Sequence, residues 1–239
     1  MVTSTINLLY KREYDITDKI KIIIPTVGEV VDNEDDYYTI VSSLTAMPID
    51  MMLQLDDIGI DFAKITEYEL FLILFQGLKF QDTSLVFGDL DLGKFERGIN
   101  ENTNDMVLID RENDIVIDRS VQNKIAETLR KIHHIEKDRR MPANEDAKKY
   151  MLERARTKAK RKKRTKTSEL EDLIIALVNA EQFKYDFEGA RNLTIYQFNE
   201  SVRQIVKNKN YEHIMHGVYS GTISTKDLSQ DDMNWLSRK

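Results

Sequence analysis

The most concentrated chemistry in this chain of 239 residues is a basic run at residues 154–166. It reads RARTKAKRKKRTK, with nine basic residues in thirteen positions and no acid. Such a run can neutralise nucleic-acid phosphates, act as a localisation signal through KRKKR at 160–164, or form a solvated helix face that meets an acidic partner. The candidate partner or polyanion contacts are Arg154, Arg156, Lys158, Lys160, Arg161, Lys162, Lys163, Arg164 and Lys166.

Two observations weigh against nucleic acid as the first choice. No aromatic residue, which could stack on bases, lies between Tyr150 and Phe183. The net charge is −6, so without the nine charges of the run the remainder is −6 − 9 = −15, which would repel a polyanion. We therefore expect a solvated or partner-facing basic helix, with nucleic-acid binding as the alternative.

Metal ligands occur only at weak spacings. His213 and His216 stand at i and i+3 without a third ligand at a fitting distance in sequence. The acidic series Asp105, Asp110, Asp114 and Asp118 lacks the spacing of a calcium loop, and aspartates at hairpin turns and strand ends have their own conformational reason. We expect turn chemistry here and no bound metal.

Catalytic signatures are equally weak. The chain has no cysteine, which excludes a disulfide framework, a thiolate metal site and a cysteine nucleophile. The glycines of FGDLDLG do not have the spacing of a phosphate-binding loop, and neither a serine nucleophile elbow nor an H-E-x-x-H sequence is present. We expect a protein that is not an enzyme and uses no cofactor.

Composition indicates the fold that positions these residues. Apolar residues make up 41% of the chain and charged residues 32%, while glycine and proline together occupy twelve positions, nine and three. This balance favours a predominantly helical α+β protein with a sizeable core. No apolar run approaches the length that spans a bilayer, so no membrane association is expected.

In the first half, short apolar runs at 6–10 and 20–24 predict a β-hairpin, and the spacing over 37–55 predicts helix with a second short helix after Pro48. Thr66 and Glu69 form a capping box that begins a buried helix ending near Gly77. The segment 84–93 predicts a strand with a glycine break. Residues 106–110 and 114–118 predict two strands joined by a tight turn.

The second half predicts helices throughout. An apolar stripe runs through 120–140, and a long polar helix starts near Asn144 and includes the basic run. Ser168 with Glu171, and Thr194 with Gln197, mark two more helix starts. A short helix ending near Gly217 precedes an extended tail, whose late apolar residues Trp235 and Leu236 we expect to anchor it to its own domain or to a partner.

The sign of the net charge changes near residue 120, close to the point where the predicted elements change from mixed α and β to helix. Residues 1–120 carry 24 acids and 10 bases (10 − 24 = −14), and residues 121–239 carry 17 acids and 25 bases (25 − 17 = +8). We predict an acidic α+β module at 1–118 and a basic helical module at 119–239, with a polar helix and connector at 144–167 and a tail at 217–239. The nearest countercharge for the basic run is then the acidic half itself or an acidic partner.

The block FKYDFEGARNLTIYQFNESVRQIVKNKNYEHIMHGVYSGTISTKDLSQDDMNWLS resembles uncharacterised proteins of tailed-bacteriophage structural gene clusters. The opening YDITDKIKIIIPTVGEV, followed by an acidic loop and a T-E-Y-E-L helix, is similar to the start of phage tail or baseplate assembly chaperones. The resemblance implies a non-enzymatic role in virion morphogenesis, in which the protein binds apolar segments of a tail component.

Three functional alternatives remain open at this point. The first is the assembly chaperone, the second a permanent component of tail, neck or baseplate, and the third a nucleic-acid-binding protein that uses residues 154–166. The expected partners are phage tail or baseplate proteins, with self-association as an open alternative. The expected location is the host bacterial cytoplasm during assembly, with the virion as the alternative.

Overall fold

The computed structural model describes residues 5–100, 103–161, 168–230 and 232–236. Helices hold 55% of the chain and strands 9%, so the predicted helical α+β class is confirmed. The α-helices are α1 Thr5–Tyr10, α2 Val27–Val31, α3 Glu34–Thr45, α4 Met52–Asp57, α5 Glu67–Leu78, α6 Ser84–Phe87, α7 Arg119–His133, α8 Glu145–Arg161, α9 Glu169–Val178, α10 Phe187–Asn192 and α11 Ile195–Tyr219. The strands are β1 Glu13–Asp15, β2 Lys21–Ile23, β3 Glu96–Ile99, β4 Met106–Asp110 and β5 Ile115–Ile117, and the 3-10 turns are η1 Leu92–Lys94 and η2 Thr225–Asp227.

Both small sheets are antiparallel. β1 pairs with β2, and β4 lies between β3 and β5. The predicted hairpin at 106–118 is confirmed, and its turn is shaped by the Asp110 carboxylate, which accepts hydrogen bonds from the backbone N–H groups of Glu112 (3.0 Å) and Asn113 (3.2 Å). β3 was not predicted because its sequence, ERGI, is mostly polar and shows no apolar alternation.

The strand predicted at 6–10 is wrong, because this segment forms α1. The partner of β2 is instead β1, which is closer in sequence, and the register places Glu13 opposite Ile23. A shorter connection loses less entropy on closure, which favours the nearer partner. The end of α1 is held by α11, since the Gln197 side-chain amide donates to the Leu9 carbonyl at 2.8 Å.

The strand predicted at 84–93 is also wrong, because residues 84–87 form the single turn α6. Val86 and Phe87 are neighbours in sequence and both are buried. Successive side chains of a strand point to opposite faces, so a strand would bury only one of the two on the core side. One turn of helix lets both side chains face the core. Gly88 ends the turn with φ of +63°, a conformation that glycine adopts without steric cost.

The predicted capping boxes at Thr66 and Thr194 are confirmed at the starts of α5 and α11. Ser168 also caps α9, since its hydroxyl accepts from the N–H of Glu171 at 2.8 Å. The final helix differs from its prediction, because α11 runs without a break for 25 residues and includes the short helix expected before Gly217.

The main core crosses the predicted module boundary at residue 118. α7 packs on α3 and α5 from the first half and on α11 from the second, and the buried apolar residues of these helices belong to one cluster. An antiparallel bridge between Thr26 and Thr194 also joins the two halves. The two halves therefore share a core, and their division into modules stays a prediction.

A second apolar cluster lies apart from the main core, around α4. We call it the methionine cluster, because it holds four of the nine methionines of the chain. Its buried members are Ile49, Leu55, Phe62 and Leu70. Its partly buried members are Ala46, Met47, Met51, Met52, Ile60, Ile65, Ile73, Leu74, Met151 and Leu152.

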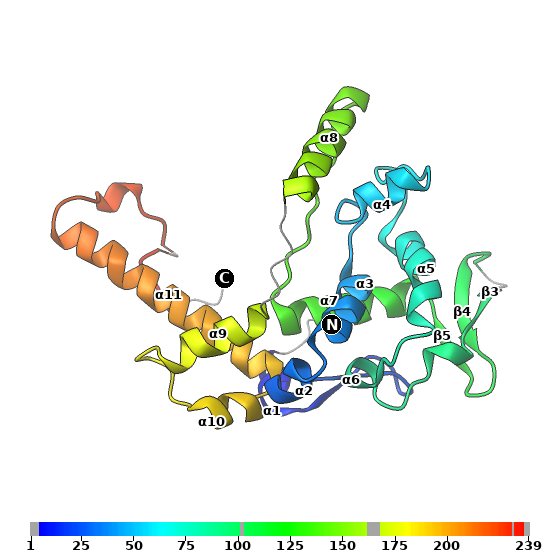
Figure 1. Ribbon diagram of the computed structural model, residues 1–239, viewed down its shortest axis with the longest axis horizontal. Helices are drawn as coiled ribbons and strands as arrows, with labels where there is room; N and C mark the ends of the chain where they lie inside the picture. The colour runs from blue at the N-terminus through cyan, green and yellow to red at the C-terminus, as the bar shows by residue number, and fades with distance from the viewer. Residues whose placement is uncertain (1–4, 101–102, 162–167, 231, 237–239) are drawn as a thin grey trace.

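Two helices leave the body of the molecule (Figure 1). α8 stands off beside α4, and the C-terminal part of α11 extends in a different direction with the tail folded back along it. The buried residues of α11 are Ile195, Tyr196 and Phe198, all near its start. Within the described residues, no helix is long and apolar enough to cross a membrane.

Candidate interaction surface

The basic run lies mostly on α8. Arg154, Arg156, Lys158, Lys160 and Arg161 belong to this helix, whereas Lys162, Lys163, Arg164 and Lys166 lie outside the described residues. The helix begins after Asn144, whose side-chain oxygen accepts from the N–H of Ala147 at 2.8 Å. Acidic residues in its first turn and basic residues in its last turn complement the helix dipole, so α8 is stabilised by its own sequence.

α8 makes little apolar contact with the rest of the protein. None of its residues is buried, and α4 is the element it contacts most. Its apolar contribution is the pair Met151 and Leu152, which pack as partly buried members of the methionine cluster. The helix therefore covers part of the cluster without being built into it.

Ion pairs fix α8 on either side of this apolar pair. Arg156 contacts the carboxylates of Asp56 and Asp57, at 2.7 Å in each case. Lys148 contacts Asp61 at 3.0 Å, and this hydrogen bond holds the pKa of the Asp61 carboxyl below its usual range. These three aspartates belong to the acidic half, so α8 joins the two halves of opposite charge.

The opposite face of α8 points away from the body. A shallow hollow on this face is lined by Tyr150, Glu153, Arg154, Thr157, Lys158 and Arg161. Among the described residues of the basic run, ion pairs are formed by Arg156 alone. The outer face thus offers cations and an exposed tyrosine to an external ligand, while the inner face is neutralised by the protein itself.

The second predicted contact, at Trp235 and Leu236, lies on the tail that returns along α11. The side-chain amide of Gln204 donates to the Trp235 carbonyl at 3.0 Å. The Trp235 side chain lines a hollow with Val202 and Val206 of α11, whereas Leu236 is 68% exposed. The tail is held on its own helix, while Met233, Trp235 and Leu236 all keep substantial exposure to solvent.

Two of the aspartates considered as metal ligands shape the local backbone instead. Asp118 caps α7 by accepting from the N–H of Val121 at 2.8 Å, and Asp110 shapes the hairpin turn. His213 and His216 are exposed on α11. In the described part of the chain, no three His, Asp or Glu side chains are grouped so that they could hold a metal ion.

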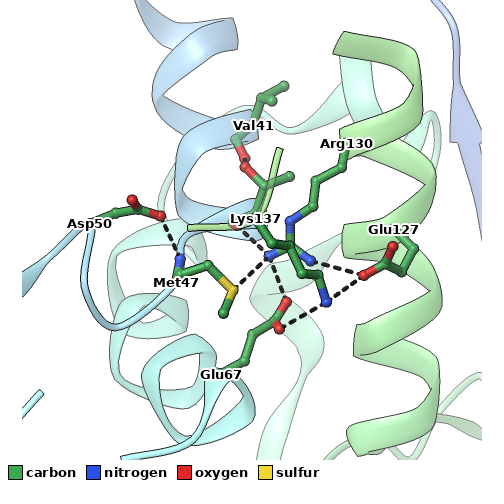
Figure 2. A network of polar contacts seen from close by, with 8 residues as sticks. Val41, Met47, Asp50, Glu67, Glu127, Arg130 and Lys137 are labelled. Atoms are coloured by element: carbon green, nitrogen blue, oxygen red, sulfur yellow. Dashed lines mark hydrogen bonds and ion pairs between the residues drawn. The ribbon is translucent and has the colours of Figure 1, made fainter. Parts of the chain in front are cut away.

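Sequence reasoning missed a buried ion network beside the methionine cluster (Figure 2). Arg130 of α7 is 4% exposed and contacts Glu67, in the first turn of α5, at 2.6 Å. Its guanidinium also donates to the Thr45 carbonyl and reaches the sulfur of Met47 at 3.6 Å. Through Glu67 and Thr45, one buried cation ties α7 to α5 and to the end of α3. Arg130 also contacts Glu127 of its own helix at 3.3 Å.

Lys137 completes this network. It contacts Glu67 at 3.3 Å and also pairs with Glu127. Two cations and two carboxylates therefore balance one another, which offsets the cost of burying Arg130. The pair with Glu127 is local, but no sequence pattern indicated that Arg130 is buried, because its partners Thr45 and Glu67 come from distant segments.

The end of α7 holds a histidine that is kept neutral. His133 packs its ring against Tyr37, with the Tyr37 hydroxyl 2.9 Å from Nε2 of His133. Burial lowers the pKa of His133 to about 4, because the charged imidazolium loses its hydration there. The neighbouring His134 ends α7 in the left-handed conformation and stacks on Tyr196 of α11.

Comparison with known proteins identifies one part of the chain. No curated protein and no solved structure matches it. Residues 160–238 match the model of a family described as the YomV second domain, which is phage-derived. The match spans α9, α10, α11 and the tail, and the protein thus carries a C-terminal region similar to a phage-derived domain.

Proposed function

We propose that this protein is a non-enzymatic phage morphogenesis factor that acts as a tail or baseplate assembly chaperone. In this role it binds an apolar segment of a tail component until that component is incorporated. The observation that carries the proposal is the methionine cluster, which stays partly exposed under a helix with no buried residue. The phage-derived match at 160–238 supplies the biological setting.

The chemistry of the cluster suits a transient partner. Methionine side chains are flexible and polarisable, so they adapt to apolar surfaces of different shape. Met47, Met51 and Met52 are partly buried, and Ile58 at the end of α4 is 61% exposed. Asp56 and Asp57 lie on α4 with Met52, and Asp61 follows shortly after this helix, so the surface carries charge close to its apolar residues.

The test is co-purification with tail components encoded in the same phage. We expect a stable complex with one of them, and we expect Met51→Ser combined with Met52→Ser to weaken it at least ten-fold. A suitable control is Ile175→Ser, which changes an apolar residue that is 46% exposed on α9, away from the cluster. Circular dichroism should show that both variants fold.

Two results would contradict the proposal. One is the absence of a complex with every tail component tested, and the other is equal binding by the cluster variant and the control. A permanent structural component is the close rival, and purified particles separate the two. A chaperone should be absent from mature virions, whereas a component of tail, neck or baseplate should be present.

One observation favours nucleic-acid binding as a second candidate function. Arg154, Lys158 and Arg161 share the outer face of α8 with Tyr150, which is 64% exposed. If this face binds DNA or RNA, the affinity should fall steeply as salt rises, because phosphate contacts release counterions. Filter binding across a salt series measures the slope.

The matched control for this test keeps the net charge equal. Changing Arg154, Lys158 and Arg161 to glutamate should abolish the salt-dependent binding. Changing three exposed lysines elsewhere to glutamate, at Lys124, Lys184 and Lys209, should retain most of it. The candidate is removed if the unmodified protein retains no DNA or RNA at low salt, or if both variants lose binding equally.

A further inference from the structure

We infer that the surface covered by α8 is a binding site for a basic amphipathic helix of a partner protein. In the free protein, α8 fills this site in place of the partner helix. The partner helix displaces α8 and takes its place on α4. This inference rests on the proposed function for the origin of the partner, because it names the chemistry of the client that the methionine cluster would take. The site itself is defined by what α8 already does in this chain.

The apolar part of the site recognises two adjacent side chains. Met151 and Leu152 of α8 join the methionine cluster, and neither is fully buried there. These two are the α8 residues that pack on the cluster, so the docked apolar face of the helix is small. A partner with larger apolar residues at the positions of Met151 and Leu152 would cover more of the cluster.

The polar part of the site recognises positive charge at both ends of this pair. Lys148 lies one turn before the apolar pair and Arg156 one turn after it. Since residues three and four apart share a helix face, positions 148, 151, 152 and 156 form one stripe. The stripe reads K-x-x-M-L-x-x-x-R, and Asp56, Asp57 and Asp61 face its two cations. The predicted partner is a helix with this pattern.

The contacts of α8 are of the kind that a competitor can replace. The side chains of Arg156 and Asp56 are each 43% exposed, and that of Asp57 is 60% exposed. Exposed ion pairs contribute little net stability because water and salt replace them readily. The Lys148–Asp61 pair is less exposed, at 17% and 21%, and a competing helix would have to supply a cation in its place. The tether also helps to hold α8, because it gives the helix a high effective concentration at the site.

A peptide of residues 144–161, labelled with fluorescein, tests the inference on the full chain. Added to the unmodified protein it should bind weakly, because the tethered α8 competes. Added to a chain with Met151→Ser and Leu152→Ser, whose own α8 docks poorly, it should bind at least ten-fold more tightly by fluorescence anisotropy. A peptide that carries Lys148→Glu and Arg156→Glu is the charge control and should not bind.

The acidic side of the site is tested by a second chain. Adding Asp56→Asn, Asp57→Asn and Asp61→Asn to the Met151→Ser, Leu152→Ser chain should reverse the gain, and circular dichroism should show that it stays folded. The inference is overturned if the peptide binds no better to the chain with the weakened α8, or if the charge control binds equally. Peptide binding without any complex with a tail component would retain the site and reject the proposed function.

Discussion

α7 and α8 are both long, charged helices with an arginine that pairs with the acidic half, and they use it in opposite ways. The ion-pair distances are nearly equal, 2.6 Å for Arg130 to Glu67 and 2.7 Å for Arg156 to Asp56. The Arg130 side chain is 4% exposed, however, and that of Arg156 is 43% exposed. The two ion pairs therefore differ in burial and not in distance. The buried pair makes α7 part of the packed core, whereas the exposed pair holds α8 only on the surface.

The largest expected effect comes from breaking the buried network. Arg130→Met removes one of the two cations that contact Glu67 and leaves the Thr45 carbonyl without this donor, so we expect the free energy of unfolding to fall by about 3 kcal/mol. Urea denaturation followed by circular dichroism measures it. Arg156→Met is the matched control on α8. If both variants lose the same stability, the proposed difference between a buried Arg130 pair and an exposed Arg156 pair is wrong.

The second expected effect is a dependence of the free energy of unfolding on pH, which arises from His133 of α7. Because the pKa of His133 is about 4 in the folded protein and about 6.5 in the unfolded chain, the unfolded state binds more protons between these values. Stability is therefore complete above pH 6.5 and is lost as pH falls toward 4. The loss should be roughly 2 kcal/mol, less than the full shift implies, because the ring remains partly exposed.

Urea denaturation at several pH values between 4.5 and 7 measures this slope, and His133→Gln should flatten it. The pKa of His134 is also lowered by burial, so a shallow slope of the same sign remains in the variant. A slope that does not change in His133→Gln would show that the imidazole is not kept neutral by its site.

The third effect compares two helix starts. Thr66 begins α5 with a reciprocal box, in which its backbone N–H donates to Glu69 at 2.7 Å and its hydroxyl accepts from the N–H of Glu69 at 3.2 Å. Thr66→Ala should lower the free energy of unfolding by about 1 kcal/mol, as cap losses in packed helices do. Asn144→Ala at the start of α8 should instead leave global unfolding unchanged and speed amide exchange within α8.

The smallest effect on global stability belongs to Arg156→Ala. Its loss frees Asp56 and Asp57 into water, where they are well hydrated, so the urea midpoint should stay within experimental error. Hydrogen exchange by mass spectrometry should nevertheless show faster exchange in α8 and in α4, with α7 unchanged. Faster exchange in α7 as well would mean that the two helices are one cooperative unit.

Sequence reasoning succeeded where a few neighbouring residues decide the structure. The boxes at Thr66 and Thr194 and the hairpin at 106–118 depend on contacts within a few positions. It failed at 6–10 and 84–93, because short apolar runs fit a strand or a helix turn equally well and only tertiary packing chooses.

The candidate surface was predicted in part. The basic helix and its acidic counterpart follow from the division of charge, because the basic residues are concentrated in one segment of the second half and the first half has an excess of acidic residues. The particular partners do not follow. Asp56 and Asp57 lie 100 and 99 positions from Arg156, and Asp61 lies 87 positions from Lys148, so only the fold brings each pair together. The Arg130 network was unpredictable for the same reason.

The bridge between Thr26 and Thr194 affects the order of events during synthesis. These residues stand 194 − 26 = 168 positions apart, and backbone hydrogen bonds flank the bridge, from Val27 to Leu193 at 2.9 Å and from Ile195 to Pro25 at 2.8 Å. The chain leaves the ribosome from its N-terminus, so more than 160 further residues must be made before the neighbour of α2 exists. A nascent chain that stops before residue 194 has no partner for this junction, and the apolar side of α2 that faces it stays uncovered until α11 has been made.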